Sequence, residues 1–161
     1  MNRLETNDKV PDITAPCVWG GEFRLSAEVR RSPVLLYFYP VNYGMMCTYY
    51  IQVMNDFRRE FDKAGIKVFH VNPDSVENHR KWMERMSSEY DHISDTEQKI
   101  CKTFGMVIDA PEGPHVPGQV NRGFALIDVN MILRYVWRAA MPPETRDLRT
   151  FIPEMRGILK N

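Results

Sequence analysis

The hydrophobic positions follow two patterns, continuous apolar runs and apolar residues spaced every three to four positions. Continuous runs over 34–39 and 66–71 predict two buried strands. Between these runs, apolar residues recur at helical spacing from about Cys47 to Ala64, and Gly65 stands where a helix would end. A strand, a helix and a second strand in this order predict a right-handed crossover, so the two strands should be parallel.

Shorter elements are expected on both sides of this unit. Prolines at both ends of 10–16 allow only a short edge strand, and glycines within 18–25 indicate a small hairpin. A helix is expected over 74–86, with an aspartate or serine as its cap. Another helix, capped within 94–96, should end at Gly105.

The C-terminal third combines a loop, a hairpin and a helix. Three prolines and two glycines within 109–119 predict the loop. Apolar runs over 123–128 and 132–137 predict two strands that pair antiparallel around a turn. The last segment, 144–159, has the pattern of an amphipathic helix, and Pro153 should kink or break it.

The order of these elements is typical of an α/β protein. It predicts a mixed central β-sheet flanked by helices on both faces, which is a thioredoxin-like layout. A chain of 161 residues suits one domain, so we expect 1–161 to form a single thioredoxin-like domain. Hydrophobic residues make up 43% of the chain, enough for a core and too many for a disordered segment.

Charge and cysteine content exclude several classes of function. The 21 basic and 21 acidic side chains cancel, which removes the electrostatic argument for a nucleic-acid or anionic-membrane partner. The longest apolar run, 34–41, is too short to cross a bilayer, and residues 1–10 do not resemble a signal peptide. Three cysteines are too few and odd in number for a disulfide-stapled secreted scaffold. These features predict a cytoplasmic protein.

Cys47 is the main candidate for chemistry because it lies in the first turn of the predicted helix. Unpaired amide groups and the positive end of the helix dipole favour an anion there, so a thiolate at this position would be a nucleophile. A free cysteine is also often a small buried apolar residue. Position alone leaves both interpretations open.

Other candidate residues indicate no cofactor site. The four histidines, His70, His79, His92 and His115, lack a metal-site spacing with cysteines or carboxylates. The chain has no glycine-rich phosphate loop, and Cys17 is interpreted as an incidental thiol. We therefore predict no metal and no other cofactor.

Residues 33–47, PVLLYFYPVNYGMMC, resemble the peroxiredoxin active-site segment Pro-x-x-x-Thr-x-x-Cys. Pro40 and Cys47 fall on its proline and its peroxidatic cysteine. Four further segments resemble peroxiredoxin segments in the same order: VPDITAP, VNPDSVENHRKW, SDTEQKICKTFGM and NRGFALID. Together they cover roughly residues 10–138 and make the chain similar to the AhpC/TSA peroxiredoxins, especially the bacterioferritin comigratory protein or PrxQ subgroup.

The resemblance implies a thiol-dependent peroxidase that reduces hydrogen peroxide or small organic hydroperoxides. Cys47 would be the peroxidatic cysteine, Pro40 would shape and shield its loop, and Arg122 would contact both the sulfur and the peroxide. Cys101 would be the resolving cysteine and form a disulfide with Cys47 after local unwinding of the helix. A thioredoxin-type reductant would restore both thiols, and the protein would be a monomer or a homodimer.

Two residues depart from the peroxiredoxin pattern. Gly44 replaces the motif hydroxyl that would bond the peroxide, and Tyr50 stands where the family usually has glutamate. Asn42, Tyr43 or Tyr50 is a possible substitute donor. The departures favour an alternative, a degenerate peroxiredoxin-like redox sensor or binding module. A thioredoxin-like disulfide oxidoreductase is disfavoured because the chain has no C-x-x-C motif.

Overall fold

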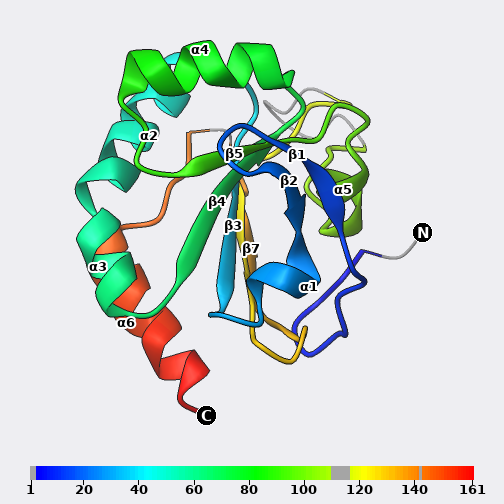
Figure 1. The fold of residues 1–161 in the computed structure, drawn as a ribbon, viewed down its shortest axis with the longest axis vertical. Coiled ribbons are helices and arrows are strands. Elements are labelled where there is room, and N and C mark those ends of the chain that lie inside the picture. The colour runs from blue at the N-terminus through cyan, green and yellow to red at the C-terminus, as the bar shows by residue number, and fades with distance from the viewer. Residues whose placement is uncertain (1–2, 110–116, 142) are drawn as a thin grey trace.

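The computed structural model describes residues 3–109, 117–141 and 143–161, and these residues form a sheet with helices on both faces (Figure 1). The strands of the described part are β1 (Thr14–Cys17), β2 (Gly21–Arg24), β3 (Val34–Phe38), β4 (Lys67–Asn72), β5 (Asp91–Ser94), β6 (Gly123–Ile127) and β7 (Leu133–Arg138). The helices of the described part are α1 (Leu25–Glu28), α2 (Met45–Asp56), α3 (Arg58–Lys63), α4 (Val76–Met86), α5 (Lys99–Thr103) and α6 (Leu148–Leu159). Among them, no helix is long and apolar enough to cross a membrane.

The sheet is mixed, as the sequence predicts. Its strand order is β2-β1-β5-β4-β3-β6-β7, and β4 pairs in parallel with both β3 and β5. The pairs β1–β2, β1–β5, β3–β6 and β6–β7 are antiparallel. Both the predicted parallel crossover and the predicted C-terminal hairpin are therefore confirmed.

Strand β3 divides the core into two layers. All five of its residues are buried, and successive side chains point to opposite faces of the sheet. Leu35 and Tyr37 pack in a cluster with residues of α2, α3, α4 and α6, whereas Val34, Leu36 and Phe38 pack with residues of α1 and α5. Figure 1 shows α2, α3 and α6 on one side of the sheet and α1 and α5 on the other.

Strand β5 was not predicted, and the helix after it begins later than expected. Only four residues form the strand, all buried, so it carries no alternation of apolar and polar positions. The helix predicted from a cap within 94–96 begins at Lys99. Asp95 still serves this helix, because its carboxylate accepts hydrogen bonds from the backbone N–H groups of Ile100 (3.1 Å) and Cys101 (2.8 Å).

The long helix predicted over 47–64 is two helices. It begins earlier, at Met45, and it is interrupted at Phe57, whose backbone leaves helical geometry (φ −101°, ψ 13°). Gly65 ends the second helix as predicted, because its φ of +72° suits a residue without a Cβ atom. The resulting bend lets the second helix keep Phe61 buried.

The C-terminal helix is shorter than predicted and continues through its proline. It begins at Leu148 with the Asp147 carboxylate accepting from the Arg149 N–H group (3.0 Å), so 144–147 lies outside it. Pro153 removes one intrahelical hydrogen bond, a cost on the order of 3 kcal/mol. Buried Phe151, Ile152 and Met155 offset this cost. Most of the loop predicted over 109–119 lies outside the described residues.

Three histidines are buried together beside the parallel strands. His70 of β4, His79 of α4 and His92 of β5 have no measurable exposure, and their ring centroids lie 4.7 Å (His70–His92) and 5.2 Å (His79–His92) apart. Both ring nitrogens of His70 lack hydrogen-bond partners. Burial lowers the pKa of all three rings, that of His70 to about 3. The cluster is therefore neutral in the folded protein.

This cluster makes the protein acid-sensitive. His70 and His92 bind a proton in the unfolded chain below about pH 6.5 but stay neutral when folded, so their contribution to stability is present above that pH and is lost as the pH falls. We expect the free energy of unfolding to fall by about 1.4 kcal/mol per pH unit for each of these two histidines below about pH 6. Urea unfolding at several pH values between 7 and 4 measures this slope.

His70→Leu separates the cluster from other acid effects. The variant should lose one histidine's share of the slope, and its stability at pH 7 should hold because no hydrogen bond is removed. A variant whose unfolding free energy depends on pH as steeply as that of the wild type would contradict the assignment.

Candidate active site

Cys47 occupies the N-terminal turn of α2, as the sequence predicts. It is the third residue of the helix, and its side chain is 5% exposed. Gly44 is the N-cap and offers no side chain to the free amide groups of the first turn. Pro40 is half-buried and lies two residues after the end of β3, and the chain reaches Cys47 seven residues later. Cys47 thus belongs to the first turn of the helix, where N–H groups lack intrahelical partners and the helix dipole is positive.

Asn42 fixes the loop that leads to Cys47. Its backbone N–H donates to Asp74 Oδ2 (3.0 Å), and its Oδ1 accepts from Tyr39 Oη (2.6 Å) and Asn72 Nδ2 (3.0 Å). Because Oδ1 accepts twice, Nδ2 must be the donor to His79 Nδ1 at 3.2 Å. His79 therefore carries its proton on Nε2. This buried network ties the loop to β4 and α4.

Tyr43 holds the loop from the outside. Its backbone is left-handed (φ +66°), which is unusual for a residue other than glycine. Its ring packs against Trp82 of α4 with centroids 4.6 Å apart, and the Arg85 guanidinium lies 5.7 Å from its centroid. These contacts hold the left-handed turn that precedes Gly44.

Arg122 lies against Cys47, and it is buried. It directly precedes β6, which pairs with β3, and it is 2% exposed. Its Nη2 lies 3.7 Å from Cys47 Sγ, and its Nη1 donates to the Tyr37 hydroxyl. The fold therefore brings together the cysteine and the arginine that the sequence singles out, which lie 75 residues apart in the chain.

The Arg122 guanidinium has no acidic partner. Among the described residues, no carboxylate lies within ion-pair distance, and Nε has no hydrogen-bond partner. Burial opposes the charge, but the neighbouring Tyr37 and Cys47 outweigh this effect and raise the pKa of the guanidinium. A permanent buried cation is thus left to interact with an anion at Cys47.

A glycine lets the arginine come this close. Gly123 follows Arg122 in the chain, and a Cβ atom there would lie 2.5 Å from the Trp137 carbonyl oxygen and 2.5 Å from Met106 Cε. Contacts of that length do not occur, so a larger residue would move the start of β6. Gly123 therefore keeps Arg122 at its position beside β3.

Cys101 is not near Cys47 in this structure. It belongs to α5 on the opposite face of the sheet and packs in the other core cluster, with no measurable exposure. Burial, followed by the nearby Asp95, raises the pKa of its thiol well above the usual value. All three cysteines are unpaired. The predicted pairing of Cys47 with Cys101 remains a prediction.

Cys17 lies apart from the site as well. It is buried in β1, where burial and then Asp91 raise the pKa of its thiol to about 12. A thiol held in the neutral form is a poor nucleophile.

The three residues that the sequence offers as substitute hydrogen-bond donors make other contacts. Asn42 is engaged by the loop network, and Tyr43 is half exposed against α4. The Tyr50 hydroxyl donates its proton to the Arg146 carbonyl oxygen (2.6 Å), so this proton is already used in a hydrogen bond. Sequence reasoning missed Tyr37, although alternation along β3 places residue 37 on the face that α2 covers.

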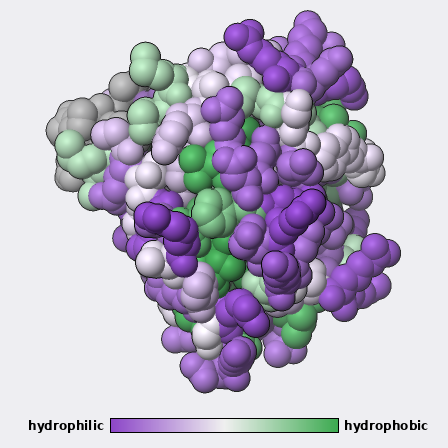
Figure 2. Space-filling view, turned by 90° about the vertical axis from the view of Figure 1, so that its left-hand side faces the viewer, coloured by the Kyte–Doolittle hydropathy of each residue, from purple (hydrophilic) through white to green (hydrophobic). Residues whose placement is uncertain are grey.

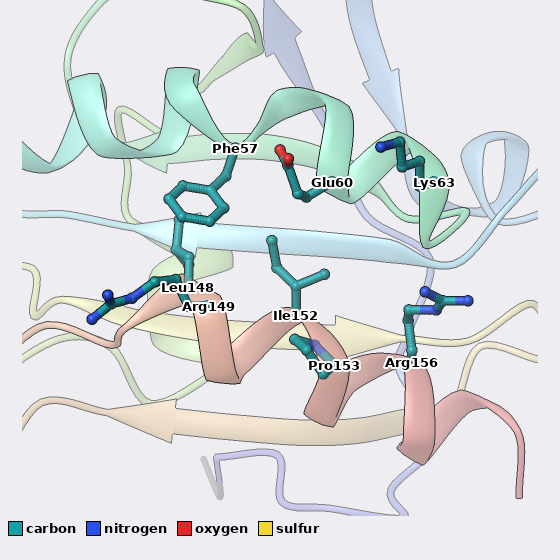
Figure 3. Close-up of a pocket in the computed structure, with 8 residues that line it drawn as sticks. All are labelled: Phe57, Glu60, Lys63, Leu148, Arg149, Ile152, Pro153 and Arg156. Carbon is teal, nitrogen blue, oxygen red and sulfur yellow. The ribbon is translucent and has the colours of Figure 1, made fainter.

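A concave surface lies on the outside of the molecule between α3 and α6. Figure 2 shows an apolar strip between hydrophilic side chains on this side. Figure 3 shows the groove, which has a volume of 180 Å³. Its lining consists of Phe57, Glu60, Lys63, Leu148, Arg149, Ile152, Pro153 and Arg156. It contains no cysteine, serine or histidine, so it offers no thiol, hydroxyl or imidazole for catalysis.

No metal centre is evident in the described part of the chain. No three histidine, cysteine, aspartate or glutamate side chains there are arranged to hold an ion. The three buried histidines are close together but do not converge on one point. The chemistry available at Cys47 is therefore that of a thiol beside a buried cation.

Comparison with known sequences identifies relatives of this chain. A profile of the AhpC/TSA family matches residues 6–136. The chloroplastic 2-Cys peroxiredoxin BAS1 of Spinacia oleracea is 32% identical over 138 residues, which cover 80% of this chain and 50% of that protein. The chain thus spans about half the length of that relative. The putative peroxiredoxin bcp of Coxiella burnetii is 26% identical over 134 residues, which cover 83% of this chain and 88% of that protein.

Solved structures share the fold over nearly the whole chain. The crystal structure of peroxidoxin BcpB from Mycobacterium tuberculosis matches with a TM-score of 0.79 at 23% identity, covering 98% of this chain and 97% of that one. Peroxiredoxin Q from Xanthomonas campestris matches with a TM-score of 0.76 at 22% identity, covering 92% and 89%. The fold is therefore the thioredoxin-like fold of these proteins. The chain belongs to the AhpC/TSA family, and its relatives include peroxiredoxins of the bcp and Q types.

Proposed function

We propose that the protein is a thiol-dependent peroxidase that reduces hydrogen peroxide or small organic hydroperoxides. One observation carries the proposal: the Cys47 sulfur lies 3.7 Å from a buried guanidinium that has no carboxylate partner in the described part of the chain. Such a cation favours the thiolate and the negative charge that develops on a peroxide oxygen. Pro40 and the Asn42 network hold the loop in place around the sulfur.

The reaction at Cys47 is a two-electron transfer. The thiolate attacks one oxygen of the hydroperoxide, so an S–O bond forms and the O–O bond breaks. The sulfur is oxidised to sulfenic acid, and the other oxygen leaves as water or an alcohol. The proton lost by the thiol reaches the leaving oxygen through solvent. Arg122 interacts with charge on the sulfur first and on the leaving oxygen afterwards.

We retain Cys101 as the resolving residue within this proposal. Strands β3 and β5 are parallel and separated by β4 alone, so the helices that follow them begin at the same edge of the sheet. The two cysteines lie on opposite faces, so the disulfide requires the first turn of α2 or the short α5 to unwind. A thioredoxin-type reductant would then restore both thiols.

A redox sensor or binding module is the second candidate. Two observations favour it: Gly44 brings no hydroxyl to the sulfur, and the Tyr50 hydroxyl is bonded to the Arg146 carbonyl oxygen. Apolar side chains exposed around the site are also compatible with a binding surface, namely those of Val41, Tyr43, Met45, Met46 and Tyr49. A sensor oxidises once, whereas a peroxidase turns over with a reductant.

Location and assembly remain predictions. The bcp-type bacterial relative supports the expected cytoplasmic location. The monomer or homodimer expected from the sequence is to be measured by light scattering of the reduced protein.

The intact mass after peroxide treatment tests the two-cysteine mechanism. With about one equivalent of hydrogen peroxide, the wild type should rapidly lose two hydrogens as a disulfide forms. Cys101→Ser should gain oxygen at Cys47, and Cys47→Ser should not react rapidly. Cys17→Ser is the matched control and should behave like the wild type.

Each departure from this pattern has a defined meaning. If the wild type gains oxygen and forms no disulfide, Cys101 is not the resolving residue, and an external thiol must complete the cycle. If the wild type and Cys47→Ser react equally slowly, the peroxidase proposal fails and the binding module takes its place.

The arginine should be required for its shape as well as for its charge. Arg122→Lys keeps a cation but loses the fork that reaches Tyr37 and Cys47 together. Losing one charge-assisted hydrogen bond costs about 1.5–3 kcal/mol, so the rate of Cys47 oxidation should fall about 10- to 150-fold. Stopped-flow tryptophan fluorescence or competition kinetics measures this rate. Arg122→Met should fall further, and a lysine variant at the wild-type rate would show that the fork is dispensable.

A further inference from the structure

The buried Tyr37 hydroxyl accepts a hydrogen bond but donates none within the described part of the chain. Its oxygen accepts a hydrogen bond from Arg122 Nη1, and the residue has no measurable exposure. A phenol that accepts one bond still has a proton to donate. Among the described residues no acceptor for that proton is found. Buried donors nearly always have partners, so the missing acceptor points to a group that arrives with the substrate.

The hydroxyl is close to the reacting sulfur. The same guanidinium contacts Tyr37 through Nη1 and Cys47 through Nη2, and these nitrogens share one carbon atom. The charge of Cys47 also contributes to raising the pKa of Tyr37, after the larger effect of burial. Tyr37 and Cys47 therefore contact the two ends of one guanidinium.

The loop has no hydroxyl at position 44, where the motif would place one beside the sulfur. Gly44 has no side chain, although a Cβ atom at this position would lie 3.6 Å from Cys47 Sγ. The neighbouring tyrosines are engaged elsewhere, Tyr39 with Asn42 and Tyr50 with the Arg146 carbonyl oxygen. Tyr37 is thus the hydroxyl that shares the Arg122 guanidinium with the sulfur.

We propose that Tyr37 is a further catalytic residue, whose hydroxyl, held by Arg122, donates a hydrogen bond to the peroxide oxygen that leaves as Cys47 is oxidised. This inference rests on the proposed peroxidase function. It takes the donor from strand β3, whereas the motif would supply it from position 44 of the loop. The substrate oxygen is the acceptor that the resting site lacks.

The phenol acts without losing its proton. Burial raises the pKa of Tyr37 well above its ordinary value, so it remains a hydroxyl throughout the reaction. As the O–O bond breaks, negative charge grows on the leaving oxygen, and the hydrogen bonds from Tyr37 and Arg122 strengthen. The leaving oxygen then takes its proton from solvent, and the sulfur retains the other oxygen as sulfenic acid.

Tyr37→Phe tests the proposal, with Tyr90→Phe and Tyr50→Phe as matched controls. Each variant keeps its ring in the core and removes one buried hydroxyl. Two rates are measured across pH for each protein: oxidation of Cys47 by hydrogen peroxide and alkylation of Cys47 by iodoacetamide. Alkylation requires an accessible thiolate but transfers no charge to a leaving peroxide oxygen.

We expect oxidation of Tyr37→Phe to be about 10- to 150-fold slower while its alkylation stays within about threefold of wild type. Both control variants should stay near wild type in both reactions. Unchanged oxidation in Tyr37→Phe would overturn the inference. An equal fall in oxidation and alkylation would also overturn it, because Tyr37 would then only orient Arg122.

A second variant checks where the hydroxyl acts. Gly44 has ordinary extended geometry (φ −66°, ψ 147°), so a serine fits its backbone, and the would-be Cβ contact with Val41 is 3.4 Å. Gly44→Ser should restore most of the oxidation rate of Tyr37→Phe and change the wild type by less than about threefold. Equal gains in both backgrounds would mean that Tyr37 and position 44 act independently, contrary to the proposal.

The proposed function and this inference fail in different ways. A wild type that reacts with peroxide no faster than Cys47→Ser refutes the peroxidase and with it the role of Tyr37. A fast wild type with an equally fast Tyr37→Phe refutes the role of Tyr37 alone.

Discussion

The site depends on one buried positive charge. Arg122 is 2% exposed, has no carboxylate partner in the described part of the chain, and cannot lose its proton. Burying an unpaired charge is unfavourable. The Tyr37 oxygen and the Cys47 sulfur offset part of this cost by contacting the guanidinium. Neither is a full anion while Cys47 is a thiol. An anion beside this guanidinium would supply the partner that the charge lacks, and the thiolate is the form of cysteine that attacks a peroxide.

The sheet supplies the geometry that this charge requires. Arg122 directly precedes β6, Tyr37 lies on β3, and the two strands pair with Tyr37 opposite Phe124. Close packing of Gly123 against the Trp137 carbonyl fixes the start of β6. The Arg122–Tyr37 pair is thus positioned by a hydrogen-bonded ladder, whereas Cys47 is positioned by a helix and a loop. The network around Asn42 keeps that loop against β4 and α4.

Much of this could be predicted from the sequence, and the omissions have physical causes. Continuous apolar runs and glycine stops gave β3, β4 and the C-terminal hairpin, and the motif gave Cys47 and Arg122. Strand β5 was missed because four residues buried on both faces show no period. Tyr37 was missed because the alternation of side chains along β3 predicts which face of the sheet a residue covers but not which side chain it contacts. Cys47 and Cys101 lie on opposite faces because their helices cover different sides of the sheet. The spacing of residues along the chain does not predict which side a helix covers.

Moving the hydroxyl from the loop to the strand changes what must move during a catalytic cycle. In the proposed cycle, a disulfide with Cys101 requires the first turn of α2 or the short α5 to unwind, because the two thiols lie on opposite faces of the sheet. If α2 unwinds, a donor at position 44 would leave the site, since Gly44 caps the helix. A donor on β3 stays in place beside Arg122 while Cys47 moves out. In the proposed mechanism the strand would therefore keep Tyr37 and Arg122 assembled, and the cost of each cycle would be confined to refolding the unwound helical turn.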